Sequence, residues 1–184
     1  RTEIATVSGE VDIEDLIPEE ECVYTLTTLG YIKRQPTEAY SLQRRGGRGV
    51  KGMTRREEDV AQTMFTCSSH DFIMFFTTKG KVYRLKGYEI PEANRTARGR
   101  AIVNVIQLEQ GEKIEAVLPM LADSTGYLVM ATEKGLIKKT HTDEFKRIAR
   151  NGKIAIKLQE DDRLIAVRFT TGEDEILVAS QGGK

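Results

Sequence analysis

Residues 43–53 read QRRGGRGVKGM and combine four cationic side chains with four glycines. Arginine carries a planar fork of donors, so Arg44, Arg45 and Arg48 suit neighbouring phosphates along one strand. Glycine has no Cβ and lets the backbone approach a polyanion and present its N–H groups. No helical pattern places polar side chains at groove-facing spacing, so contacts to base edges are not expected. The stretch predicts binding to a phosphate backbone, with sequence preference set by bendability.

Other interpretations of this stretch fit less well. A P-loop requires G-x-x-x-x-G-K-[ST], but residues 47–54 read GRGVKGMT and place Met53 where the lysine belongs. A disordered RGG-type RNA-binding tract is repetitive, whereas this stretch occurs once, between strand patterns. Runs of charged residues usually form solvated surface loops without a ligand, and this interpretation stays open as an alternative.

Composition limits the class of protein. The chain has 184 residues, 39% of them hydrophobic, which is enough for one sizeable core or for a core divided among repeats. Cys22 and Cys67 show no C-x-x-C spacing, so neither a disulfide framework nor a zinc site is indicated. His70 and His141 have no second ligand at metal-binding or catalytic spacing. We therefore expect no catalytic residue, no metal and no cofactor.

The first residues are acidic rather than basic and apolar, unlike a signal peptide. No apolar run approaches the length of a membrane span. Because two cysteines without a disulfide pattern fit a reducing compartment, the sequence predicts a soluble, cytoplasmic protein with no membrane partner.

The charged residues are unevenly distributed, although the formal net charge is +0. Acidic residues dominate positions 1–24, and basic residues dominate positions 25–56. Two further basic blocks cover positions 79–100 and 134–153. Basic blocks that recur at a regular interval indicate an internal repeat.

Glycines mark this repeat. The segments TTLGYIKR, TTKGKVYR and TEKGLIKK share one pattern, and SQGGK stands last in the sequence. Their first shared glycines, Gly30, Gly80, Gly135 and Gly182, recur about every fifty residues. In each complete copy a β-type run precedes the glycine, which supplies the positive φ of a two-residue hairpin turn, and a basic strand follows. Each unit is therefore expected to begin with a β-hairpin.

Each unit continues in the same order after its hairpin. A second glycine follows at Gly46, Gly99 and Gly152. Two β-type runs come next, and their alternation and β-branched residues predict strands. In the later copies these runs are residues 100–108, 113–120, 153–159 and 163–169. Four strands in each unit of about fifty residues are typical of a propeller blade.

The predicted units span residues 22–70, 71–122 and 123–173, and a fourth begins at 174–184. Its first strand would be ILVAS, residues 176–180, which would pair with a neighbouring blade or with a second copy because unpaired edges attract other strands. The chain contains no tryptophan, which excludes blades of the WD type.

QRRGGRG, residues 43–49, resembles the box that marks the C-terminal domain of DNA gyrase A subunits. RTEI, TTLGYIKR, TARG and KKT fit the same family, and Arg48 stands where the box often has lysine, which preserves the charge. The resemblance implies an all-β fold, a propeller-like β-pinwheel whose blades exchange strands. Family members have about six blades, so three blades plus part of a fourth would form an incomplete ring and look like a fragment.

The resemblance also implies a function. The domain would bind double-stranded DNA and bend it around a basic rim, so that the gyrase B subunit, with the rest of the gyrase A subunit, introduces negative supercoils. The breakage-reunion region with its tyrosine nucleophile is not recognisable here, so we expect a domain without catalytic activity of its own. The matching domain of topoisomerase IV, in which the box is degenerate, and a protein-interaction propeller remain alternatives. The intact QRRGG favours gyrase.

Candidate DNA-binding residues fall in three places. The box supplies Gln43, Arg44, Arg45, Gly46, Gly47, Arg48, Gly49 and Lys51. The basic strand of the first hairpin supplies Lys33 and Arg34, of which at most one faces a given surface because neighbouring side chains alternate in a strand. The loops that correspond to the box in later units supply Arg98, Arg100, Arg150 and Lys153.

Overall fold

Antiparallel sheets form the described part of the chain, in a computed structural model that covers residues 13–40, 59–120, 124–177, 179 and 181. The first sheet, in the order β3-β1-β2-β6, contains β1 (Glu21–Thr27), β2 (Tyr31–Pro36), β3 (Ala61–Ser68) and β6 (Arg100–Ala101). The second, β10-β5-β4-β7, contains β4 (Phe72–Thr77), β5 (Lys81–Lys86), β7 (Ile114–Met120) and β10 (Lys153–Ile154). The third, β11-β8-β9, contains β8 (Tyr127–Thr132), β9 (Ile137–His141) and β11 (Leu164–Thr170).

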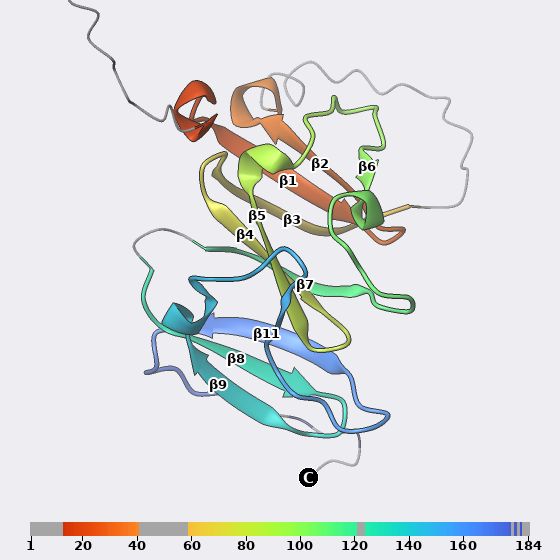
Figure 1. Ribbon diagram of the computed structural model, residues 1–184, viewed down its shortest axis with the longest axis vertical. Coiled ribbons are helices and arrows are strands. Elements are labelled where there is room, and N and C mark those ends of the chain that lie inside the picture. Colours follow the sequence, from red (N-terminus) through yellow and green to blue (C-terminus); the bar gives the residue numbers. More distant parts are fainter. Residues whose placement is uncertain (1–12, 41–58, 121–123, 178, 180, 182–184) are drawn as a thin grey trace, which may run out of the picture.

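The three sheets follow one another along the long axis of the molecule (Figure 1). Short 3-10 turns connect them, namely η2 (Gly87–Glu89), η3 (Ile102–Asn104) and η4 (Thr142–Phe145), and a further one, η1 (Ile13–Leu16), precedes β1. The expected all-β architecture is therefore confirmed.

Strands are exchanged between successive units. The first sheet is completed by β6, which lies beyond β4 and β5 in the sequence and pairs Arg100 with Ile32 and Ala101 with Tyr31 of β2. In the same way β10 pairs with Lys81 and Val82 of β5 in the second sheet. Each of these sheets thus receives its fourth strand from the unit that follows it.

The first two hairpin loops have three residues rather than the two that were predicted, and four residues separate β8 from β9 in the third. The N–H groups of Gly30, Gly80 and Gly135 each donate to the carbonyl of the threonine three residues earlier, at 3.0 Å. Their φ angles of 85°, 79° and 90° are the positive values expected of these glycines. A turn followed by a left-handed glycine is the usual form of a three-residue hairpin loop, so the glycine adds one position to the loop.

The run at 100–108 was predicted as one long strand, and this was wrong. Only Arg100–Ala101 form a strand, after which the chain turns into η3. Ile102 and Ile106 are buried while Val103 is 61% exposed, so the apolar pattern has a period close to four rather than two. The N–H of Ile106 donates to the carbonyl of Ile102. The β-branched residues at 102–106 therefore form a turn and not a strand.

Two other predicted strands also differ. In the run at 153–159 only Lys153–Ile154 form a strand, and the adjacent Ala155 and Ile156 are both buried, which a strand with one solvent face does not allow. In ILVAS the described residues 176, 177 and 179 belong to no strand. The first strands of the other hairpins are bonded on both sides, as β1 is by β3 and β2, and the described residues supply no such neighbours for 176, 177 and 179.

Two apolar clusters hold the sheets together. The first lies between the first and second sheets and centres on Tyr24, Phe75 and Ile102. The second lies between the second and third sheets and centres on Phe76 and Met130. Because β4 contributes Phe75 to one cluster and Phe76 to the other, the second sheet is buried on both faces.

The two cysteines lie opposite each other in the first sheet. Cys22 of β1 is in register with Cys67 of β3, and both are free thiols in the first cluster. Burial raises the pKa of Cys67 to about 12 and also raises the pKa of Cys22. The thiols are therefore held in their neutral, unreactive form.

The hairpin glycines allow a matched test of packing between units. A Cβ at Gly80 would lie 2.5 Å from the carbonyl oxygen of Ile156, whereas a Cβ at Gly135 would meet no described atom within 4 Å. Both residues have a similar positive φ. Gly135→Ala should therefore lower the free energy of unfolding by about 1–2 kcal/mol through backbone strain alone, and Gly80→Ala should lower it by clearly more, in urea unfolding. Equal losses would show that Gly80 does not set the approach of the following unit.

Candidate nucleic-acid interface

The residues of the predicted box, Gln43 to Gly49 together with Lys51, lie outside the described residues. Their role stays a prediction of the sequence. The interface is therefore built here from the described basic residues of β2 and of the two loops that lead into β6 and β10.

Lys33 is half-buried and engaged with protein groups. Its ammonium group donates to the backbone carbonyls of Asn94, Arg95 and Ala97 at 3.2, 3.0 and 3.0 Å. Burial lowers the pKa of Lys33. The three N–H donors of the ammonium group are thus directed at the loop between β5 and β6, and its role in DNA contact stays untested.

Arg34 is likewise engaged with protein groups. Its Nε donates to the carbonyl of Ile90 at 2.7 Å. Its Nη1 lies 3.6 Å from the carboxylate of Glu20 and 3.7 Å from that of Glu92, and its side chain is only 15% exposed. Arg34 therefore joins the segment before β1 to the segment after η2.

The loop between β5 and β6 presents its arginines to solvent. Arg98 and Arg100 are both exposed. The Arg98 guanidinium lies 4.7 Å from the centre of the Tyr31 ring on β2, a cation–π distance. Arg100 begins β6, so its backbone is fixed by pairing with Ile32.

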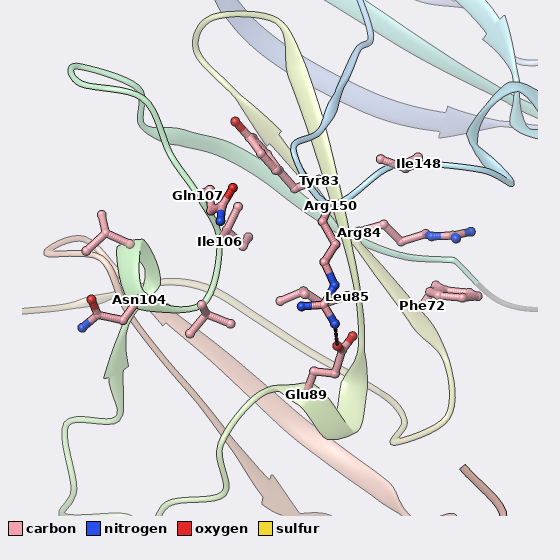
Figure 2. A pocket seen from close by; sticks show the side chains of 12 residues that line it. Phe72, Tyr83, Arg84, Leu85, Glu89, Asn104, Ile106, Gln107, Ile148 and Arg150 are labelled. Carbon is pink, nitrogen blue, oxygen red and sulfur yellow. Dashed lines mark ion pairs between the residues drawn. The ribbon is translucent and has the colours of Figure 1, made fainter. Parts of the chain in front are cut away.

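The loop between β9 and β10 has the same character. The side chain of Arg150 is 97% exposed, and its nearest carboxylate, Glu89, is 3.9 Å away (Figure 2). Lys153 begins β10 as Arg100 begins β6, but its ammonium donates to the carbonyl of Glu144 at 2.5 Å. Arg150 is thus the more available of these two cations.

Further arginines lie in these loops. Arg95 and Arg147 are exposed, and no ion pair to either is seen within the described ranges. The sequence patterns did not single them out, although both belong to the recurring basic blocks. An exposed guanidinium without an internal acceptor is free to bind phosphate, so these two belong with the candidates.

A cavity of about 480 Å³ opens between the second sheet and the segment that follows β6. Figure 2 shows Arg84 and Leu85 of β5 on one side and Asn104, Ile106 and Gln107 on the other. Ile148 and Arg150 border it from the loop before β10. Its polar side chains are those of Tyr83, Arg84, Glu89, Asn104, Gln107 and Arg150, so it offers both donors and acceptors to a ligand.

The described part of the chain offers no metal centre, since no three of its His, Cys, Asp or Glu side chains gather in a way that could hold a metal ion. Among those residues there is also no helix long and apolar enough to cross a bilayer.

Comparison with known proteins places these features in a family. The family model "DNA gyrase C-terminal domain, beta-propeller" matches residues 23–68, 71–119 and 126–171. The chain is 47% identical over 184 residues to the DNA gyrase A subunit of Clostridium acetobutylicum, and 49% identical over 183 residues to that of Staphylococcus aureus (strain NCTC 8325 / PS 47). These matches cover 100% and 98% of the chain but only 22% and 21% of the relatives.

A solved structure agrees in fold. The crystal structure of the C-terminal domain of DNA topoisomerase IV superimposes with a TM-score of 0.71 at 25% identity, covering 85% of this chain and 47% of that one. The repeated strand-exchanged sheets thus define a β-propeller of the topoisomerase C-terminal type. The chain belongs to the DNA gyrase C-terminal domain family.

The engaged and exposed arginines should differ in their effect on stability. Arg34→Ala would leave the Ile90 carbonyl without its donor and Glu20 without its cation, so it should lower the free energy of unfolding by about 1–3 kcal/mol. Arg100→Ala, at an exposed side chain, should change it by no more than about 0.5 kcal/mol. Urea unfolding of both variants measures the difference, and an unaffected Arg34 variant would remove its structural role.

Proposed function

We propose that this chain is a DNA-binding and DNA-wrapping domain without catalytic activity. It would act within a gyrase-type, ATP-dependent type II topoisomerase in the bacterial cytoplasm. Its partners there would be the gyrase B subunit, with the remainder of the gyrase A subunit. The propeller units are proposed at residues 22–70, 71–122 and 123–173, with a fourth beginning at 174.

One observation carries this proposal. Corresponding loops of two successive units hold exposed arginines, Arg98 and Arg100 before and in β6 and Arg150 before β10. Each loop is fixed to the preceding sheet by the short strand that follows it. The guanidinium groups are therefore carried on a rigid frame at successive steps along the molecule, as a path for a continuous polyanion requires.

The contacts on such a path would be to phosphates. Arginine forks bind phosphate oxygens through paired hydrogen bonds, while the described loops offer no helix that could enter a groove and read bases. DNA that follows successive sheets must bend, and its deformability then sets any sequence preference. Bending in a fixed direction is how a non-catalytic domain would give strand passage its direction.

Replacing loop arginines tests this directly. The variant Arg98→Ala, Arg100→Ala, Arg150→Ala should bind duplex DNA more weakly than the parent. Removing one arginine–phosphate interaction should reduce the slope of log affinity against log salt by about 0.9. Arg163→Ala is the matched control, since Arg163 is also exposed but pairs with Glu133 at 2.9 Å.

The outcomes distinguish the candidate functions. A protein-interaction propeller would show weak DNA binding with the same salt slope in the parent and the triple variant. The domain of topoisomerase IV is the second candidate because its fold agrees, but the intact QRRGG and the sequence relatives favour gyrase.

The predicted box calls for its own test in the full-length gyrase protein. Arg44→Ala, Arg45→Ala and Arg48→Ala together should abolish wrapping and supercoiling, because three phosphate-binding groups are removed. The melting temperature should stay close to that of the parent if these side chains are exposed. A triple variant that supercoils DNA as well as the parent would show that the box is not the wrapping element.

A further inference from the structure

The first sheet shows how the outer edge of a hairpin strand is covered. Beyond β6, the edge of β2 is bonded by residues 91–93. The N–H of Arg34 donates to the carbonyl of Pro91 at 3.2 Å, and the N–H of Ala93 donates to the carbonyl of Arg34 at 3.1 Å. This segment runs parallel to β2, and Glu92 at its centre lies 3.7 Å from the Arg34 guanidinium.

The same edge of the second sheet is open. Arg84 occupies the place in β5 that Arg34 occupies in β2, four residues after the hairpin glycine. Its backbone N–H and C=O therefore also face away from the partner strand, β4. Arg84 lies beyond Lys153, the first residue of β10, which pairs with Val82, and no described residue makes a backbone hydrogen bond to Arg84 on this side.

A difference in loop length explains the opening. The stretch from buried Ile90 to Gly99 is two residues longer than the stretch from buried Phe145 to Gly152. The shorter loop reaches Arg84 only through a hydrogen bond from its guanidinium to the carbonyl of Lys146. The cavity of about 480 Å³ lies between β5 and residues 103–107, and Ile148 and Arg150 of this loop border it (Figure 2).

The cavity beside β5 suits a segment like residues 91–93, which cover the corresponding edge of β2 in the first sheet. Three consecutive residues, Tyr83, Arg84 and Leu85, line it, as expected where a strand presents its edge. Val103, which is 61% exposed, gives it an apolar wall. Arg84 lies with its guanidinium 3.8 Å from the centre of the Phe72 ring, and Arg150 lies 3.9 Å from Glu89, the one carboxylate that lines the cavity.

We propose that this cavity binds an extended acidic peptide segment of a partner protein. The segment would add to the edge of β5 as a parallel strand and exchange backbone hydrogen bonds with Arg84, as residues 91–93 do with Arg34. An acidic side chain at its centre would face Arg84, as Glu92 faces Arg34. The cavity shares Arg150 with the proposed DNA path, but the peptide can be tested without DNA.

The chain itself supplies the probe. A capped pentapeptide with the sequence of residues 90–94, Ile-Pro-Glu-Ala-Asn, should shift the amide resonances of β5 and of residues 103–107 saturably when it is added to the full chain. A peptide with glutamine in place of the glutamate should bind about two- to fivefold more weakly, since an exposed ion pair contributes little. A peptide with N-methylalanine in place of alanine should not bind, because it lacks the N–H that would donate to the backbone carbonyl of Arg84.

A protein variant locates the binding. Val103→Glu places a like charge at the cavity wall on an exposed side chain and should weaken binding of the acidic peptide. Val60→Glu, at a residue that is 58% exposed and lies just before β3, is the matched control and should bind as the parent does. The proposal is overturned if no saturable shifts occur, if the N-methylated peptide binds equally well, or if Val103→Glu binds like Val60→Glu.

Discussion

The pairing of each sheet with a strand from the next unit is the constraint on which the structure depends. The contact between β6 and β2 and that between β10 and β5 each involve only two residue pairs. These contacts nevertheless fix where the loops that precede β6 and β10 cross the neighbouring sheet. A Cβ at Gly99 would collide with the carbonyl of Ile32, so the crossing demands glycine. The backbone of the exposed arginines beside this crossing is therefore held in a fixed position.

The same strand pairing separates two groups of cations that the sequence does not distinguish. Lys33 and Arg34 lie where strand and loop meet, and their charges are directed at carbonyl groups and carboxylates of the protein. Arg98, Arg100 and Arg150 lie on the outside of the same crossings and keep their charges exposed. Burial of an unsatisfied cation is costly, so the inner pair can only exist with its acceptors, while the outer group stays available to a polyanion.

The fold class and the hairpin glycines could be predicted from the sequence because local rules determine them. Gly30, Gly80 and Gly135 have the expected positive φ. The run at 100–108 could not be predicted correctly, because its isoleucines are buried by packing against another unit, a contact that local alternation does not reveal. For the same reason the sequence did not distinguish Lys33, whose acceptors lie more than sixty residues away in the chain, from exposed cations.

Hydrogen exchange of the full chain with and without duplex DNA tests the central claim, that successive crossings present one continuous path for a polyanion. The account predicts that DNA slows exchange in both exposed loops, residues 95–100 and 147–151, and that protection of the two loops rises together with DNA concentration. It also predicts that both protections fall steeply as salt is raised. Protection of one loop without the other, or protection confined to the hairpin loops at 28–30 and 133–135, would contradict it.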